Sequence, residues 1–341
     1  MHTDARGIYP LERLDGSRER PPVVPARVTI GAAMEGYFGI TDHGWYEHLS
    51  RTPGPKDANF WRPSTRAYRL PVGTPFFFKL RAPHNAVAGF GFFASFSVLP
   101  DWLAWDTFGE ANGVANLGEL RSRLTKIREG ARIEKDSQGR IGCALIAESR
   151  FFTRDEWIAA PANWKPRTQS GERFDLTTGE GARVWEECVA RSSLTLPISP
   201  TTSPSKTKLR FGAPVLFRPR LGQGIFRVQV LDAYGRACAV TGEHSLPVLE
   251  AAHIKPYARG GEHAVANGLS LRSDIHRLFD KGYVTVDDGQ RFVVSSRLRT
   301  DFGNGRSYEG LNGRKLELPR EAVLRPQNDA LAWHREEVFV G

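Results

Sequence analysis

Cysteine is scarce in this chain. Only Cys143, Cys188 and Cys238 occur among 341 residues, and they stand far apart. An odd number of cysteines at such spacing excludes a disulfide framework and a zinc site with four cysteine ligands. Hydrophobic packing must therefore hold the fold together, and Cys238 is best explained as a small buried apolar residue.

Long apolar runs are missing as well. No stretch reaches the roughly 20 consecutive apolar residues that cross a membrane, and the N-terminus is polar rather than signal-like. We therefore expect a cytoplasmic protein without a membrane partner.

An excess of acidic residues is also absent, because the net charge is +9 and the pI is about 9.6. From Ser205 onward the chain has 21 Lys and Arg against 15 Asp and Glu, whereas the residues before it have 26 against 23. The basic surplus is concentrated in the C-terminal part, which suits a polyanionic partner. Many soluble proteins are equally basic, so charge alone does not identify that partner.

Length and composition divide the chain into four segments. Residues 1–26 are rich in charge and proline, which predicts an extension without a core of its own. Residues 196–214 combine Ser, Thr, Pro, Lys and Arg without an apolar period, as a linker does. Residues 27–195 and 215–341 are then two predicted domains, because 341 residues suffice for two cores.

The expected fold class is α+β. Strand-like FFFKL and AVAGFGFFASFSV are separated by a turn, and LGELRSRLTKIREGA and GEGARVWEECVAR have the pattern of helices. For residues 27–195 this favours a curved sheet or small barrel wrapped by helices.

The most informative stretch runs from Leu249 to Asp280. LPVLEAAHI predicts a strand, the Gly-Gly pair in YARGGEH predicts a turn, and NGLSL begins a second extended piece. SDIHRLFDKG predicts a helix with Ser273 or Asp274 as N-cap and Gly282 as its stop. The expected order is strand, loop, strand, helix.

His253, Asn267 and His276 mark this stretch at spacings of fourteen and nine residues. His276 and Asp280 are four apart, so one helix face presents both to a single cation. A neutral His253 opposite them is suited to take a proton from water that attacks a phosphodiester. The alternative is two core histidines and a cap-forming asparagine.

AAHIKP, NGLSL and DIHRLFD resemble the HNH nuclease family, whose active unit is a hairpin and helix around one divalent metal. The resemblance implies that His253 is the general base, that Asn267 holds the loop and orients the base, and that His276 is a metal ligand with Asp280 as the second. Many HNH enzymes carry an acidic residue or histidine immediately before the base, where this chain has Ala252. The metal would then depend on His276, Asp280, phosphate oxygens and water.

The cofactor implied by this resemblance is a divalent metal. Mg²⁺ is expected because it prefers oxygen ligands, and imidazole ligation also admits Mn²⁺ or Ni²⁺. The implied partner is double-stranded DNA. Arg220, Arg227 and Lys255 are candidate DNA contacts, and a solvated basic edge is the alternative explanation for the arginines.

Aromatic residues next to polar ones mark two places in the first predicted domain. Asn59, Phe60 and Trp61 precede a proline, and Trp105 is followed by Asp106. Rings for stacking and polar groups for hydrogen bonds are what a pocket for a flipped nucleobase needs. A core role is the alternative for each ring.

A longer resemblance covers most of the chain from about Gly31. TDHGWYEHL, NFWRPS, GFGFFASFSVLP, AWDTFGEANG and RPRLGQGIFRVQVLDAYGRACAVTG are similar to a group of bacterial HNH proteins described as restriction endonucleases. Their N-terminal domain is similar to the PUA-like superfamily, which includes EVE and SRA readers of modified bases. The resemblance implies a restriction-type DNA endonuclease directed to modified cytosine.

Two other functions stay open at this stage. The N-terminal domain could read unmodified sequence, with a partner methyltransferase protecting the host, or the protein could bind DNA without cutting, as Ala252 in place of a ligand would allow. A homodimer is expected from geometry, because one HNH centre cuts one strand at a time.

Overall fold

The computed structural model describes residues 34–192 and 222–341, apart from residues 52, 55, 135, 137 and 304. The predicted extension 1–26, the predicted linker 196–214 and Arg220 lie outside the described residues. Helices and strands are mixed in both described stretches, so the predicted α+β class is confirmed. No helix in these two stretches is long and apolar enough to cross a membrane.

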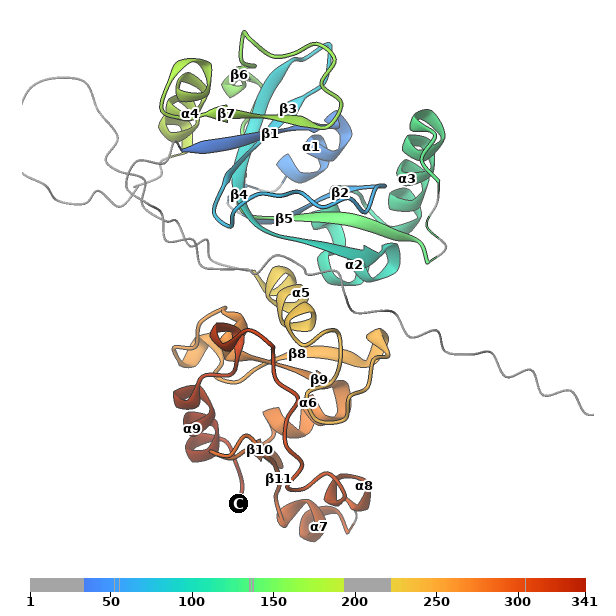
Figure 1. Ribbon diagram of the computed structural model, residues 1–341, viewed down its shortest axis with the longest axis vertical. Coiled ribbons are helices and arrows are strands. Elements are labelled where there is room, and N and C mark those ends of the chain that lie inside the picture. Colours follow the sequence, from blue (N-terminus) through green and yellow to red (C-terminus); the bar gives the residue numbers. More distant parts are fainter. Residues whose placement is uncertain are drawn as a thin grey trace, which may run out of the picture. The chain divides into compact units, whose positions relative to one another are not determined.

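The N-terminal stretch is built on one sheet (Figure 1), whose strands follow the order β2-β5-β4-β3-β1-β7, with β6 paired to β4. The pair β1 and β3 is parallel and the others are antiparallel. The strands are β1 Glu35–Thr41, β2 Lys56–Arg62, β3 Pro75–Leu80, β4 Ala86–Pro100, β5 Arg140–Phe151, β6 Ile158–Ala159 and β7 Gly171–Asp175.

Helices cover this sheet, as the sequence predicted. They are α1 His43–Ser50, α2 Asp101–Phe108, α3 Leu117–Ala131 and α4 Gly179–Ser192, with short 3-10 turns at Gly109–Asn112 and Arg154–Glu156. The side chain of Asp42 caps α1, because it accepts a hydrogen bond from the backbone N–H of Trp45. Every residue of β3 is buried, because aromatic side chains fill both of its faces.

The C-terminal stretch begins with α5 Gln223–Ala233 and continues with the strands β8 Leu249–His253 and β9 Gly268–Arg272, which lead into α6 Ser273–Asp280. The order strand, loop, strand, helix is therefore confirmed. The remaining elements are β10 Val284–Val286, β11 Phe292–Val294, α7 Arg297–Phe302, α8 Arg306–Glu309 and α9 Asn328–Glu337, with 3-10 turns at Leu246–Val248, Tyr257–Arg259, Val265–Asn267 and Ala322–Leu324. Figure 1 shows α6 beside β8 and β9.

The predicted N-cap of α6 is wrong. The cap position is Arg272, no side chain bonds to the free backbone amides there, and Ser273 is already helical. Asp274 instead accepts two hydrogen bonds from the guanidinium of Arg272, at 2.7 and 2.8 Å. The predicted stop is confirmed, since Gly282 follows the helix end with φ +75°, a conformation that glycine adopts without strain.

One hydrophobic core joins the elements of the C-terminal stretch. Its fully buried side chains come from α5, from the hairpin β8-β9, from α6 and from β10 and β11. Cys238 is among them and is 0 % exposed, as predicted for a small apolar residue. The three cysteines are all buried and free.

Candidate nuclease site

The hairpin β8-β9 and the helix α6 bring the three predicted residues of the motif together. His253 ends β8 and pairs with Gly268 at the start of β9, directly after Asn267. The chain then passes from β9 into α6 without a loop, which sets His276 beside β8.

Asn267 closes the loop between the two strands. Its side chain is 2 % exposed and makes three hydrogen bonds: it accepts from the backbone N–H of Lys255 at 3.0 Å and donates to the carbonyls of Lys255 and Glu262, both at 2.8 Å. Its backbone carbonyl accepts from Ile254 at 2.9 Å. The amide thus fixes the chain immediately after His253, the geometry that the predicted orienting role requires.

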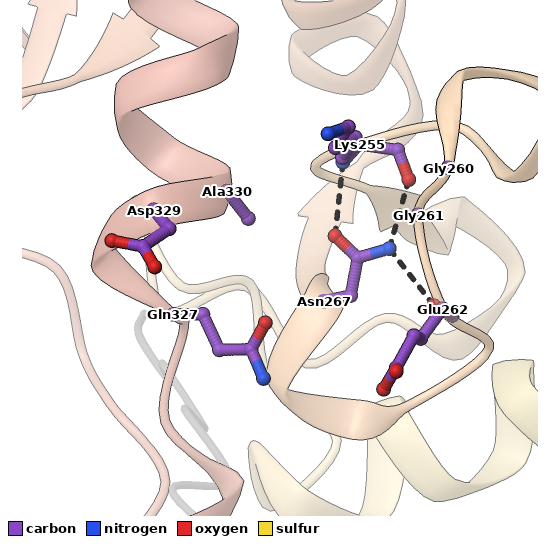
Figure 2. A pocket seen from close by; sticks show the side chains of 8 residues that line it. All are labelled: Lys255, Gly260, Gly261, Glu262, Asn267, Gln327, Asp329 and Ala330. Carbon is purple, nitrogen blue, oxygen red and sulfur yellow. Dashed lines mark hydrogen bonds between the residues drawn. The ribbon is translucent and has the colours of Figure 1, made fainter.

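The side chain of Asn267 also lines a small polar pocket (Figure 2). It encloses about 230 Å³ and is lined by Lys255, Gly260, Gly261, Glu262, Asn267, Gln327, Asp329 and Ala330. A side chain at Gly261 would meet the carbonyl oxygen of Lys255 at 1.8 Å, so only glycine fits this turn. Lys255, which was predicted to contact DNA, forms part of the wall, and its ammonium lies 5.6 Å from the centre of the Trp333 ring.

His253 is half-buried between two other rings. The ring of Phe226 stacks on it at 3.9 Å between centroids and 12° between planes, and His263 meets it edge-on at 5.0 Å. Burial first, and then the neighbouring His263 and His276, lower the pKa of His253 to about 4. The imidazole is therefore neutral at pH 7, as a general base must be.

The Nε2 atom of His253 is buried and has no hydrogen-bond partner among the described residues. Buried polar atoms are nearly always paired, and an exception calls for an explanation such as a catalytic role or an absent partner. The Nδ1 atom of His263 is unpaired in the same way. The local sequence around His263 indicates a turn only, so it does not predict that this ring lies beside His253.

His276 lies between two carboxylates. Its Nδ1 is 2.7 Å from Oε2 of Glu250 on β8, and its Nε2 is 3.4 Å from Oδ2 of Asp280, one turn further along α6. Histidines that bind metals usually donate their other ring N–H to a carboxylate, which fixes the ring and its tautomer. Glu250 has this position, which could not be predicted from the residue immediately before the base, because Glu250 lies three residues before His253.

Ala252, the residue immediately before the base, is 0 % exposed and belongs to the hydrophobic core. A carboxylate there would be buried among apolar side chains, at a high cost in free energy. The acidic side chain nearest the site on β8 is instead that of Glu250, which is 42 % exposed.

The donor atoms at His276 fit one divalent cation. Ligand atoms about 2.1 Å from a metal and at right angles stand roughly 3 Å apart, close to the 3.4 Å between His276 Nε2 and Asp280 Oδ2. Across the described stretches, no group of three or more His, Cys, Asp or Glu side chains is arranged to hold a metal. A cation held by His276 and Asp280 alone would need phosphate and water at its other positions.

The other predicted DNA contacts lie elsewhere. Arg227 on α5 donates to Asp106 on α2 at 2.7 Å, so the two residues form an ion pair with each other. Trp105 is half-buried against the core of the N-terminal sheet. The structure does not bring these residues to His253 and His276.

The structure places Asn59, Phe60 and Trp61 in β2, which pairs with β5. Asn59 is 0 % exposed and donates to Asn112 at 2.9 Å, while Phe60 is 8 % exposed. The indole N–H of Trp61 donates to the backbone carbonyl of Asn112 at 2.7 Å. These contacts give the three residues a role in packing, and a base could reach Asn59 only if the sheet opened.

A hairpin and a helix that join a neutral histidine to a histidine–carboxylate pair define a class of metal-dependent nuclease modules. Residues 238–287 match the model of a family described as HNH endonuclease. This confirms the resemblance of this stretch to the HNH nuclease family. The three motif residues His253, Asn267 and His276 lie within the matched stretch, and so does Asp280.

Solved structures are similar over parts of the chain. A modification-dependent TagI restriction endonuclease is 22 % identical over 33 % of this chain and 37 % of its own, with a TM-score of 0.24. The ASCH protein from Zymomonas mobilis is 13 % identical over 44 % of this chain and 94 % of its own, with a TM-score of 0.29. The chain therefore spans well under half of the TagI enzyme. No curated protein matches the sequence.

Proposed function

We propose that this protein is a divalent-metal-dependent DNA endonuclease of the restriction type, with His253 as its general base. One observation carries the proposal: a neutral His253 with an unpaired Nε2 lies in the same hairpin-and-helix unit as the pair His276 and Asp280. A base and a metal ligand pair are the two parts that hydrolysis of a phosphodiester needs.

In the proposed reaction, His253 Nε2 accepts a proton from a water molecule as the water oxygen bonds to phosphorus. The bond from phosphorus to the leaving sugar oxygen breaks, and that oxygen takes up a proton from solvent. His276 and Asp280 would hold the cation, with Glu250 fixing the imidazole of His276. When bound, Mg²⁺ would stabilise the negative charge on the phosphate and the leaving oxygen, and Mn²⁺ or Ni²⁺ are alternatives.

The segment after the base supplies groups for holding DNA. Tyr257 is 60 % exposed, its ring meets His263 at 5.2 Å, and Arg259 is exposed two residues later. Together with Lys255 they present two cations and an exposed aromatic ring within a few residues of His253. Cations neutralise phosphates and exposed rings stack on bases, so this segment is suited to the DNA next to the cut.

The finer part of the proposal assigns the reading of modified cytosine to the N-terminal stretch. Its support is a group of rings at the surface: His43 stacks on His84 at 4.3 Å, and Trp157 meets His84 edge-on at 5.3 Å. The side chain of His43 is 38 % exposed, so a base could extend the stack. This group replaces Asn59 and Phe60 as the better candidate, because those side chains are buried.

Other parts of the account remain predictions: a cytoplasmic site of action, a homodimer for double-strand cuts, a reader of unmodified sequence, and a DNA-binding module that does not cut. The unpaired His253 Nε2 and the orienting carboxylate Glu250 favour the cutting enzyme over the binding module.

Cleavage of matched plasmids tests the proposal. Unmodified, 5-methylcytosine and 5-hydroxymethylcytosine DNA are incubated with Mg²⁺ or Mn²⁺ and the wild type or His253→Ala. If the wild type cuts only modified DNA and His253→Ala cuts none, both the nuclease and the modified-base reader are supported. Equal cutting of all three substrates removes the modified-base reader and keeps the nuclease. DNA binding without cutting under any of these metals overturns the nuclease.

A further inference from the structure

Phe226 on α5 is the aromatic side chain that faces His253. The two rings are nearly parallel and in contact, and Phe226 is 1 % exposed. The tip of the Phe226 ring also lies close to Gly268, the residue that pairs with His253 across the hairpin: a Cβ added at Gly268 would meet the ring tip at 2.9 Å. Gly268 thus limits the movement of the Phe226 ring, and the Phe226 ring limits the movement of the His253 imidazole.

The helix that carries Phe226 is held on its other side by the N-terminal sheet. Ile225 and Val228 are buried in the core formed with α2, β4 and β5. Gln229 donates to the carbonyl of Ala94 at 3.4 Å, and the hydroxyl of Ser97 donates to Asp232 at 2.7 Å. Polar and apolar contacts therefore join α5 to β4.

A second polar contact follows the end of the helix. Arg236 donates to the carboxylate of Asp232 at 2.8 Å and to the carbonyl of Val98, on β4, at 2.7 Å. Asp232 thus links β4 to α5 through both Ser97 and Arg236. Neighbouring residues of one helix, Ile225 and Phe226, belong to two different cores.

We propose that Phe226 is a positioning residue for the base of the nuclease, and that α5 fixes this base relative to the N-terminal sheet. The assignment of His253 as the base rests on the proposed function. A flat ring in contact with the imidazole limits rotation of the His253 side chain, so Nε2 keeps one direction. The orientation of His253 then depends on where α5 is held, and α5 is held by β4.

Phe226→Leu tests the first half, with Phe292→Leu as the matched control. Both phenylalanines are 1 % exposed in the same core, but Phe292 has no ring contact with a histidine in the described stretches. We expect similar falls in melting temperature. Phe226→Leu should also lower kcat for DNA cleavage by roughly 10- to 100-fold at nearly unchanged KM, and Phe292→Leu should leave kcat within about twofold. Equal kcat values in the two variants would overturn the positioning role.

The NMR signals of the His253 ring protons give a readout that does not depend on cleavage. In the wild type the stacked phenyl ring shifts these protons upfield, and Phe226→Leu should return them toward ordinary values while Phe292→Leu leaves them in place. Unchanged shifts in Phe226→Leu would overturn the proposal. If the wild type does not cut DNA, the proposed function fails, and these shifts still decide whether Phe226 holds the ring.

A double-mutant cycle tests the second half. Asp232→Asn weakens the contacts with Ser97 and Arg236, and we expect kcat to fall by roughly 2- to 30-fold. In the Phe226→Leu background the same substitution should have little further effect, because the ring that transmits the position of α5 is gone. Effects on kcat that multiply independently would show that the sheet does not act through Phe226.

Discussion

Two histidines of the C-terminal stretch stack on phenylalanine rings in nearly the same way. The ring centroids of His253 and Phe226 are 3.9 Å apart, with 12° between the ring planes. Those of His334 and Phe279 are 3.6 Å apart, with 11° between the planes. Burial lowers the pKa of both to about 4. By packing and by pKa the two sites are alike.

Their hydrogen bonds differ. Both nitrogens of His334 are satisfied: Nδ1 is 2.9 Å from the hydroxyl of Thr285, and Nε2 is 3.0 Å from the carbonyl of Phe279. His253 Nε2 has no partner in the described residues. The low pKa therefore does not separate His253 from His334, whereas the hydrogen bonding of their ring nitrogens does.

The largest expected effect is a difference in DNA cleavage between variants of the two histidines. His253→Ala should lower kcat for DNA cleavage by about 10²- to 10⁴-fold, because the water loses its base, and should leave DNA binding unchanged. His334→Ala is the control, and its folded fraction should cut at a rate close to that of the wild type. Kinetics of plasmid nicking measure both. If His253→Ala cut DNA within about tenfold of the wild-type rate, His253 would not differ from His334 as a base.

The next effect is the dependence of the protein's stability on pH. His334 is 2 % exposed with its pKa lowered from 6.5 to about 4, so the unfolded chain binds a proton at this residue more readily than the folded one. Its contribution to stability is complete above pH 6.5 and is lost as the pH falls toward 4, by about 3 kcal/mol at most. Melting temperatures between pH 7 and pH 4 should fall less steeply for His334→Gln than for the wild type. If the melting temperature of His334→Gln fell as steeply with pH as that of the wild type, the lowered pKa of His334 would be contradicted.

Glu250→Gln tests the partner of the second motif histidine. Removing the charge from the carboxylate that fixes His276 should weaken metal binding by about 10- to 100-fold. Calorimetric titration with Mn²⁺ measures this, with Glu262→Gln as control, because Glu262 is exposed at the pocket lined by Asn267, whereas the hydrogen bond to His276 comes from Glu250. Equal affinities in the two variants would leave Glu250 without a role in metal binding.

The smallest effect is expected at Arg227. Its ion pair with Asp106 is partly exposed, and such pairs contribute up to about 1 kcal/mol to the free energy of unfolding. Arg227→Ala should therefore change stability little in urea unfolding. A loss of DNA affinity in this variant would restore the predicted DNA contact, and unchanged affinity would leave Arg227 as a partner of Asp106.

Sequence predicted the hairpin and helix well because the signals there are local. A turn marked by Gly260 and Gly261, a polar-apolar pattern on both sides and a stop at Gly282 all lie within 40 residues. The fixed spacing of the motif residues adds a chemical signal to the structural one.

Residues that meet through the fold escaped prediction. Glu250 reaches His276 across 26 positions, and Phe226 reaches His253 from a helix before the hairpin. The interpretation of Asn59 and Phe60 as pocket residues rested on their polar neighbours in sequence. Their burial depends on pairing with β5, more than 80 residues away, which no local pattern reveals.

Chemical rescue of His253→Gly tests the central claim most directly. The variant is supplied with plasmid DNA, Mg²⁺ or Mn²⁺ and free imidazole, which can occupy the space left beside Phe226. If His253 is the base, the variant is inactive alone and imidazole restores part of the cleavage, with a rate that rises with the concentration of neutral imidazole. A folded variant that binds DNA and metal but cuts as fast as the wild type, or that imidazole does not rescue, would contradict the account.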